Sequence, residues 1–304
     1  MNSVSIITVN FNQSFITEQL LSSITATNTY ANIEIIVVDN GSKVNDVPML
    51  QAKYPDVKFI RSDVNTGFAG GNNIGVKEAT GEYLFFVNND TEFTANLVQA
   101  LVNVLDKNPD VGMISPKIRY FDKPDMIQYV GFTPMNYYLA RNYCMGQFET
   151  DKGQYDNITG PVAYAHGAAM MVKREAIDKA GLMAENFFLY YEEMDWCDHI
   201  KKAGYQVWID TNALIYHKES VSVGRVSGLK EYFMNRNRIL FIRRNAPLQA
   251  RFIFYIYFIC LVVPRNILVY NKKGYKGFTG LLLKAIWWNI TQNINSTKLG
   301  YPLN

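Results

Sequence analysis

Residues 83–90 read YLFFVNND, an apolar stretch that ends in two asparagines and an aspartate. Three similar stretches precede it, at Val4–Val9, Ile33–Val38 and Val57–Ile60, and each ends in a polar or glycine-containing turn. They are continuously apolar instead of alternating, and helix-compatible segments such as Phe15–Thr25 separate them. Strands buried on both faces and separated by helices are typical of a mostly parallel sheet covered by helices. The sequence therefore predicts an α/β fold.

The remainder of the chain continues this pattern less regularly. Helices are predicted at Asn96–Lys107, Arg174–Ala180 and Glu192–Ala203, and strands at Val111–Pro116, Ala168–Val172 and Gln206–Ile209. Between them, Arg119–Asp156 is irregular and rich in Tyr, Asp, Pro and Gly, which favours long loops or a variable hairpin.

Polar side chains follow two of the predicted strands directly. Asp39 follows the second strand, and Asn88, Asn89 and Asp90 follow the fourth. In open parallel sheets, ligands bind beyond the carboxyl ends of the strands. Hard divalent cations take oxygen ligands, commonly one or two carboxylates together with phosphate oxygens and water. An aspartate at a strand end is more often a turn or capping residue, so only the ordered set of strand ends favours Asp90 as a metal ligand.

A glycine-rich segment, NTGFAGGNN at residues 65–73, opens into a helix predicted at Asn72–Ala79. Glycines let a backbone approach a ligand closely, and a helix N-terminus favours an anion. The spacing matches neither a P-loop nor the dinucleotide fingerprint. The segment is therefore predicted to contact a ligand, without identifying it.

Three carboxylates, Glu192, Glu193 and Asp195, occur within four residues at the start of a predicted helix. Their mutual repulsion favours raised pKa values, which suits a general base that takes a proton from a hydroxyl group. Acidic residues are also common in the first turn of a helix because of its dipole. The cluster alone therefore leaves a structural role open.

The composition limits the class of protein. With 304 residues, 48% of them hydrophobic and 14% aromatic, the chain can bury one large core or a core with a smaller appendage. Its three cysteines are too few and too scattered for a disulfide framework or a structural zinc site. Because the N-terminus has no secretory signal pattern, we expect a cytoplasmic protein.

Charge is distributed unevenly along the chain. Residues 1–224 carry 17 Lys and Arg against 26 Asp and Glu, whereas residues 225–304 carry 13 against the single Glu231. The basic part is also rich in aromatic and aliphatic residues. That combination favours an anionic membrane surface over nucleic acid.

The pattern beyond Ser227 is helical, but its longest apolar run, Phe252–Val263, is shorter than the roughly 20 residues that a spanning helix needs. Pro264 and Arg265 interrupt the run. We therefore expect an interfacial or re-entrant contact, with the protein peripheral on the inner face of the cell membrane. A helix packed on the preceding α/β domain is the alternative.

The motifs TVNFN, VVDNGS, NTGFAGGNN, FFVNND and FFLYYEEMDW, in this order, resemble those of family 2 glycosyltransferases, in particular the rhamnosyltransferase-like subset. The resemblance covers residues 3 to about 245. It implies a GT-A fold, in which a nucleotide-binding half at 1–90 and an acceptor half at 91–226 share one sheet. A basic, aromatic-rich helical extension at 227–304 would follow. The resemblance also implies an inverting mechanism.

The same resemblance implies the residues of the site. Those around the nucleotide sugar would be Thr8, Asn10, Asp39, Asn65, Gly70, Gly71, Asn72, Asn88 and Asn89. Asp39 would read the pyrimidine. Asp90 matches the metal-binding end of the family's DXD-type motif, in which Asn88 replaces the commoner aspartate. With His217 it would hold a divalent cation, Mg²⁺ or Mn²⁺.

For the base, the family's second acid corresponds to Glu193, one methylene longer than the usual aspartate. Glu192 is the alternative base, and Asp195 would orient the acceptor or support the site. His166 precedes the strand that forms the floor of the acceptor site, and His199 is expected to be structural.

Two arginines of the YFMNRNRILF stretch, Arg236 and Arg238, are expected near a diphosphate or an anionic lipid carrier, with a solvated helix face as the alternative. The predicted reaction moves a sugar from a dTDP- or UDP-linked donor to a saccharide or lipid-linked glycan in cell-surface polysaccharide synthesis. Rhamnose is the first candidate for the sugar. Transfer directly onto polyprenyl phosphate is the runner-up. A non-catalytic nucleotide-sugar-binding protein and a nucleic-acid-binding protein are the readings from other classes.

Overall fold

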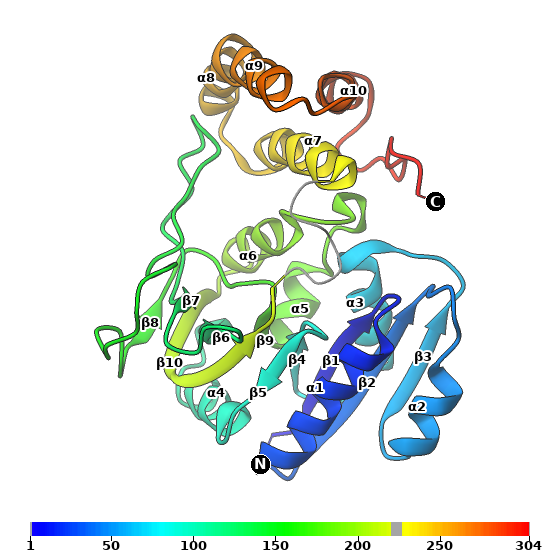
Figure 1. The fold of residues 1–304 in the computed structure, drawn as a ribbon. Coiled ribbons are helices and arrows are strands. Elements are labelled where there is room, and N and C mark those ends of the chain that lie inside the picture. The colour runs from blue at the N-terminus through cyan, green and yellow to red at the C-terminus, as the bar shows by residue number, and fades with distance from the viewer. Residues whose placement is uncertain (1, 220–226, 304) are drawn as a thin grey trace.

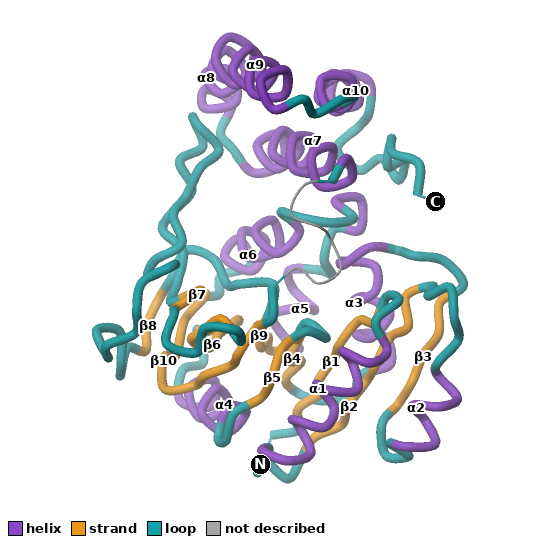
Figure 2. Tube along the Cα trace, viewed as in Figure 1, coloured by secondary structure: helices purple, strands orange, loops and turns teal. Residues whose placement is uncertain are grey.

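The computed structural model describes residues 2–219 and 227–303, which form one ten-stranded sheet, helices on both of its faces and a further helical layer (Figures 1 and 2). The predicted boundary at residue 226 lies in the segment 220–226, outside the described residues.

The N-terminal half alternates strands and helices as predicted. Its elements are β1 (Val4–Asn10), α1 (Ser14–Thr27), β2 (Ile33–Asn40), α2 (Val47–Lys53), β3 (Lys58–Ser62), α3 (Gly67–Glu78) and β4 (Tyr83–Val87). The four strands are parallel, in the order β3-β2-β1-β4. Their register places Asn10 opposite Asp39.

The second half extends the same sheet through β9, β6, β10 and β5. Its elements are β5 (Thr91–Phe93), α4 (Leu97–Lys107), β6 (Val111–Tyr120), β7 (Ile127–Tyr129), β8 (Thr159–Pro161), β9 (Ala169–Lys173), α5 (Arg174–Ala180), η1 (Glu185–Phe187), α6 (Glu192–Lys202) and β10 (Gln206–His217). Strand β9 runs antiparallel to both β4 and β6, so this half of the sheet is mixed. Strand β5 pairs with β10 so that His217 lies opposite Thr91, next to Asp90.

Two apolar cores cover the two faces of the sheet. One contains Leu20 of α1 and Leu101 of α4, and the other contains Ala69 of α3 and Ile200 of α6. The helical layer belongs to the second core, since Leu240 of α7 is in the same cluster. The region beyond residue 226 is therefore packed on the part of the molecule that contains the sheet.

The helical layer consists of four helices and a π-helical turn among the described residues. They are α7 (Gly228–Asn245), α8 (Leu248–Tyr257), η2 (Phe258–Val262), α9 (Val263–Lys273) and α10 (Phe278–Thr291). In Figure 1, α7 lies over α6, and α8, α9 and α10 lie over α7.

The apolar run does not end at Pro264, as the sequence had suggested. Leu248–Lys273 is one helix of 26 residues with a mean hydropathy of 2.0 over its most apolar window, 17% of which is buried. By length and composition alone it is long enough to cross a membrane. The turn before Pro264 is π-helical, and the wider ring leaves room for the proline, which lacks an N–H group.

The glycine-rich segment also differs from the prediction, because α3 already begins at Gly67. A Cβ atom at Gly71 would lie 2.8 Å from the Val9 side chain, and one at Gly75 would lie 2.5 Å from Ile7. At Gly70 it would lie 2.6 Å from the side chain of Thr66. These glycines therefore let helix α3 pack closely on β1 and on its own first turn.

Gly75→Ala should destabilise the protein, because the added methyl group overlaps Ile7 in the core. We expect a loss of about 1–3 kcal/mol, the usual range for overpacking. Thermal unfolding followed by circular dichroism measures the change in Tm.

Gly280→Ala is the matched control, since Gly280 also lies in a helix but has no atom within 4 Å of an added Cβ. Because alanine has a higher helix propensity than glycine, this substitution should leave the free energy of unfolding unchanged or raise it by up to about 1 kcal/mol, so the Tm should not fall. Equal effects of the two substitutions would contradict the packing role of Gly75.

Candidate active site

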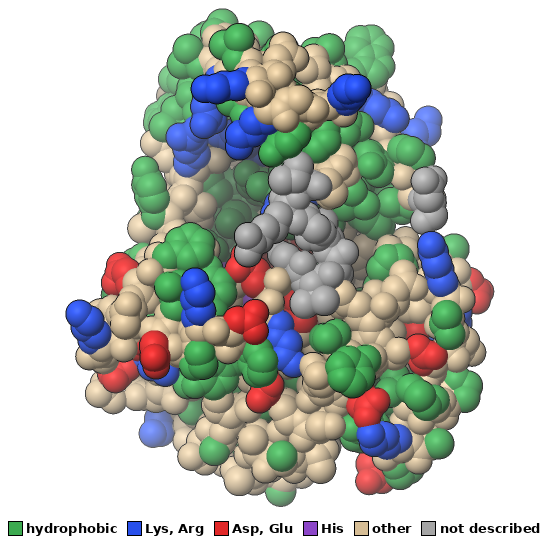
Figure 3. Space-filling view, viewed as in Figure 1, with side chains coloured by type: hydrophobic (Ala, Val, Ile, Leu, Met, Phe, Trp, Pro, Cys, Tyr) green, Lys and Arg blue, Asp and Glu red, His purple; other side chains and the backbone are tan. Residues whose placement is uncertain are grey.

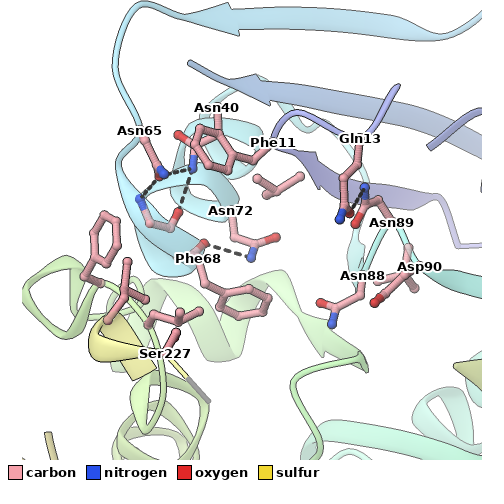
Figure 4. A pocket seen from close by; sticks show the side chains of 16 residues that line it. Phe11, Gln13, Asn40, Asn65, Phe68, Asn72, Asn88, Asn89, Asp90 and Ser227 are labelled. Atoms are coloured by element: carbon pink, nitrogen blue, oxygen red, sulfur yellow. Dashed lines mark hydrogen bonds between the residues drawn. The ribbon is translucent and has the colours of Figure 1, made fainter. Parts of the chain in front are cut away.

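A cavity of about 400 Å³ lies beyond the carboxyl ends of β1 and β4 (Figure 4). It is lined by Val9, Phe11, Gln13, Asn40, Asn65, Gly67, Phe68, Asn72, Val87, Asn88, Asn89, Asp90, Phe188, Leu189, Ser227 and Leu229. Of the predicted ligand-binding residues, the lining includes Asn65, Asn72, Asn88, Asn89 and Asp90. A volume of this size suits a small-molecule ligand, and amides with aromatic rings are a common lining.

The other residues predicted around the nucleotide sugar are not among those that line the cavity. They are Thr8, Asn10, Asp39, Gly70 and Gly71. Asp39 is buried, accepts a 2.9 Å hydrogen bond from the Ser42 N–H and lies 3.6 Å from the Arg61 guanidinium. The Asn10 amide donates to Asp39 at 3.2 Å. Thr8 Oγ1 is buried without a hydrogen-bond partner among the described residues. This network joins the ends of β1 and β2.

Asn40, which follows Asp39 in the sequence, lines the cavity and binds the start of α3, and the motif alone did not predict either role. Its side-chain oxygen accepts from the N–H and the hydroxyl of Thr66, and its amide donates to the Gly67 carbonyl at 2.9 Å. Asn65 caps the same turn by accepting from the Gly67 N–H at 2.9 Å. Asn40 and Asn65 thus shape the start of α3, on the cavity side (Figure 4).

The three residues after β4 point in different directions. Asn88 lies at the cavity, and its backbone N–H donates to the Ala168 carbonyl at 3.0 Å (Figure 4). Asn89 turns toward α1, where its amide donates to Thr17 at 3.1 Å. The Asp90 carbonyl accepts from the Lys218 N–H at 2.8 Å, which ties this turn to the end of β10.

Asp90 and His217, predicted as metal ligands, lie together. Asp90 Oδ1 and His217 Nε2 are 3.1 Å apart in a buried environment, and neither atom has a hydrogen-bond partner among the described residues. His217 Nδ1 is 2.9 Å from Gln128 Oε1. If Nδ1 carries the proton, Nε2 presents a lone pair, the arrangement common for metal-binding histidines.

These two atoms fit a divalent cation. Two ligands about 2.1 Å from a metal and at right angles to each other lie about 3 Å apart, close to the observed separation. No group of three His, Cys, Asp or Glu residues able to hold a metal occurs in residues 2–219 and 227–303. A cation here would therefore need oxygen atoms of a ligand or water to complete its shell.

The adjacent glutamates at the start of α6 have different surroundings. Glu192 is buried, and its Oε2 has no hydrogen-bond partner within the described part of the chain. Burial, and then the charge of Glu193, raise the pKa of Glu192. Glu193 lies beside Gly167, where an added Cβ would be 3.6 Å from Glu193 Cγ and 3.8 Å from Phe68, a cavity residue. Burial raises the pKa of Glu193 as well.

Asp195 is held by the helical layer. Its Oδ1 accepts from Arg244 Nε at 2.9 Å and from the Asn245 amide at 2.6 Å. His199 Nε2 lies 3.8 Å from its other oxygen. Of the roles predicted for Asp195, these contacts favour support of the site.

His166 is packed among rings. Its ring stacks on Phe132 with centroids 6.0 Å apart and meets the edge of Tyr129 at 5.3 Å. Its Nδ1 accepts from the Ala168 N–H at 3.1 Å. Burial lowers the pKa of His166 to about 3, and the nearby imidazole of His217 acts in the same direction.

The segment 186–191, just before the two glutamates, is held by helix α7. The Asn237 amide donates to the carbonyls of Phe187, Leu189 and Tyr190 at 2.9, 2.7 and 2.8 Å. Positive φ angles occur at Phe188, Tyr190 and Tyr191. Left-handed backbone is unfavourable for such residues and persists where the surroundings hold it.

Arg236, expected near a diphosphate, is instead fully buried. Its guanidinium donates to the carbonyls of Phe187 at 2.9 Å, of Leu299 at 2.8 Å and of Asn186. Burial lowers its pKa to about 10. The expectation for Arg236 was therefore wrong: it binds backbone carbonyls from two distant segments and is not available to a ligand.

The sequence is similar to those of known glycosyltransferases. The profile of the family described as glycosyl transferase family 2 matches residues 5–181. The chain is 26% identical over 245 residues to the low-salt glycan biosynthesis hexosyltransferase Agl10 of Haloferax volcanii, covering 79% of this chain and 75% of that protein. It is 22% identical over 229 residues to the N-acetylglucosaminyl-diphospho-decaprenol L-rhamnosyltransferase of Mycobacterium tuberculosis, covering 68% and 73%.

Solved structures share the fold. The mannosyltransferase PcManGT from Pyrobaculum calidifontis, in complex with GDP-Man and Mn²⁺, superposes with a TM-score of 0.57 at 14% identity, over 95% of this chain and 87% of that one. GalNAc-T7 with UDP, GalNAc and Mn²⁺ gives a TM-score of 0.62 at 14% identity, over 80% of this chain and 48% of that one. The likeness confirms the predicted GT-A fold.

Asn237→Asp should loosen the segment 186–191, because an ionised carboxylate faces three carbonyl oxygens that it cannot serve as a donor. We expect a loss of about 1–3 kcal/mol, the cost of leaving buried polar groups unpaired. Denaturant unfolding measures the change, and hydrogen exchange of residues 186–193 shows whether it is local.

Asn271→Asp is the control, since it makes the same chemical change at an exposed position of α9. It should leave both measurements unchanged. Unaltered exchange in Asn237→Asp would show that the segment is held by other contacts.

Proposed function

The chain belongs to glycosyl transferase family 2, and we propose that it moves a sugar from a nucleoside-diphosphate donor onto a saccharide or lipid-linked glycan acceptor, with inversion at the anomeric carbon. The observation that carries the proposal is the pair Asp90 and His217, two buried ligating atoms 3.1 Å apart beside a cavity of about 400 Å³. Rhamnose on dTDP or UDP is the first donor candidate, because one relative is named an L-rhamnosyltransferase.

The cavity has the chemistry that a nucleotide sugar requires. The rings of Phe11, Phe68 and Phe188 offer apolar surface for a base and a sugar, while Asn72 and Asn88 offer amides. Asp39, buried at the end of β2 beside Arg61, is proposed to bind the base.

A divalent cation, Mg²⁺ or Mn²⁺, fits next to the donor diphosphate. Asp90 and His217 would hold it, and it would neutralise charge on the nucleoside diphosphate as that group leaves. The relatives crystallised with Mn²⁺ have the same fold. Gln128 would fix the tautomer of His217.

The base is assigned to Glu193. The assignment is supported by Gly167, whose added Cβ would lie within 3.8 Å of both Glu193 and the cavity residue Phe68, whereas Glu192 is buried near the charge of Arg236. In the proposed step, Glu193 takes the proton of the acceptor hydroxyl as its oxygen bonds to the anomeric carbon. The bond from that carbon to the phosphate oxygen breaks, and the nucleoside diphosphate leaves.

The acceptor is proposed to be lipid-linked, with the helical layer on an anionic membrane surface. The outer faces of α8, α9 and α10 expose large apolar side chains: Leu248, Phe252, Leu261, Leu268, Trp287 and Ile290 are 61–79% exposed. In Figure 3, hydrophobic side chains lie along the upper edge of the molecule, with Lys and Arg beside them. Apolar surface flanked by cations matches the interface of an anionic bilayer.

Glu193→Gln should reduce transfer by roughly 10²–10⁴-fold, the usual contribution of a general base. Only the ionised carboxylate accepts a proton, so wild-type activity should fall as the pH drops through the raised pKa of Glu193. That fall should occur above about pH 4.3, where an ordinary glutamate titrates. Transfer of labelled sugar, measured against pH, tests both points.

Two further variants make the result interpretable. Glu192→Gln should keep most of the activity, and loss of activity in this variant alone would move the base to Glu192. Asp90→Ala should lose transfer together with metal-dependent donor binding, whereas Glu193→Gln should retain donor binding in a thermal-shift assay. Full activity of Asp90→Ala, or of the wild type in EDTA, would refute the metal assignment.

The double substitution Phe252→Ser and Trp287→Ser should weaken binding to phosphatidylglycerol vesicles about tenfold or more, because each aromatic ring contributes about 1.5–3 kcal/mol when buried. Co-sedimentation with vesicles measures the bound fraction. Phosphatidylcholine vesicles should bind the wild type less, since the basic side chains then lack an anionic partner.

Phe15→Ser is the control, because Phe15 of α1 is 68% exposed but lies outside the helical layer. It should bind vesicles like the wild type. Equal binding of all variants would refute the membrane proposal, and a concentration-dependent dimer that the double substitution dissolves would replace the membrane by a second copy of the chain.

A further inference from the structure

A second polar cavity, of about 380 Å³, lies between the excursion that follows β7 and the helices α7 and α9. Its lining includes Arg141 and Asn142 of the excursion, Tyr191 before α6, and Arg238 and Asn266 of the helical layer. In Figure 1 the excursion rises from the sheet to the helical layer. The reaction proposed above does not use any of these residues.

The cavity contains cationic and donor groups that the protein leaves unpaired. Arg238 Nε and Asn142 Nδ2 are buried without hydrogen-bond partners among the described residues. In that part of the chain, neither Arg141 nor Arg238 forms a salt bridge. An unpaired buried donor is costly, so such groups favour an anionic ligand with several oxygens.

The carboxylate at the cavity wall, Glu231, forms no salt bridge with Arg141 or Arg238 in the described part of the chain. Glu231 Oε1 accepts from the Asn235 amide at 2.5 Å and from the Tyr270 hydroxyl. The second nitrogen of the Arg238 guanidinium donates to the Leu139 carbonyl at 2.6 Å, which holds the excursion on α7 and leaves Nε without a partner.

The cavity is next to the proposed base. Leu189 lines the donor cavity and Tyr191 lines the second one, and two residues of chain span at most about 7 Å. Burial raises the pKa of Tyr191 to about 12, Arg238 and Arg141 oppose the shift, and Glu193 adds to it. The phenol of Tyr191 therefore lies among these three charged side chains.

We propose that this cavity binds the diphosphate of the lipid-linked acceptor, with Arg141 and Arg238 as its cationic ligands. The inference rests on the proposed function and identifies a site for its acceptor. An acceptor whose diphosphate lies beside Tyr191 presents its sugar toward Glu193 and the donor cavity, and its lipid toward the helical layer.

Isothermal titration with farnesyl diphosphate in EDTA tests the site without turnover and without metal. Arg141→Gln and Arg238→Gln should each lower the affinity about tenfold or more, the usual loss when a charge-assisted hydrogen bond is removed. Lys272→Gln removes an exposed charge of α9 outside the cavity and should change the affinity by less than about twofold. Because Arg141 is exposed, its substitution does not disturb the fold.

Three further ligands separate the possible sources of the anion. Inorganic pyrophosphate should bind more weakly than farnesyl diphosphate with the same dependence on both arginines, and farnesol should not depend on them. Equal affinity of farnesyl diphosphate for all variants would overturn the proposal. So would an effect of the arginines on phosphatidylglycerol vesicles alone, which would make the site a bilayer headgroup site.

The experiments distinguish failure of the acceptor-site proposal from failure of the proposed glycosyl transfer. Both arginine variants should bind the donor nucleotide with Mn²⁺ like the wild type, since neither residue lines the donor cavity. If the acceptor site is wrong, Glu193→Gln still abolishes transfer. If transfer itself is absent, farnesyl diphosphate binding still depends on Arg141 and Arg238.

Discussion

The backbone of residues 186–190 is held by two neighbouring side chains of α7, and the arrangement of the site depends on that contact. The side chains of Arg236 and Asn237 donate hydrogen bonds to the backbone carbonyls of Asn186, Phe187, Leu189 and Tyr190. On the opposite side, the first turn of α3 donates its Phe68 N–H to the remaining carbonyl, that of Phe188, at 2.7 Å. The end of η1 and the loop after it, with positive φ angles at Phe188 and Tyr190, are thereby fixed between the cavity and the helical layer.

This contact joins the helical layer to the candidate active site. Arg244 and Asn245 bind Asp195 on α6, and Arg243 donates to the Gln292 carbonyl at 2.9 Å. Several cations of the basic region thus pair with backbone carbonyls and one buried carboxylate inside the protein. The net charge of +12 carried by residues 225–304 therefore overstates the charge that is exposed at the surface. The lysines of α9 and α10, by contrast, are exposed.

The sequence predicted what depends on local pattern. The strands, most helices and the asparagines and aspartate after β4 follow from runs of buried residues and from strand ends that meet at one edge. It could not predict partners across the fold. Gln128 reaches His217 from an irregular segment 89 residues away. The role of Arg236 was predicted wrongly because the sequence alone does not distinguish a buried arginine from one that binds a ligand. The continuation of the helix through Pro264 was missed because a π-helical turn has no recognisable composition.

The two glutamates show how the fold gives neighbouring residues different chemistry. Helix α6 turns about 100° between consecutive residues, so Glu192 and Glu193 cannot share one environment. Glu192 lies near Arg236, the cation that holds the preceding loop, and its charge is partly compensated there. For Glu193 burial raises the pKa, and backbone hydrogen bonds at the start of the helix lower it. Burial thus raises the pKa of both glutamates, but only for Glu192 does a cation, the arginine that anchors the loop, oppose the shift.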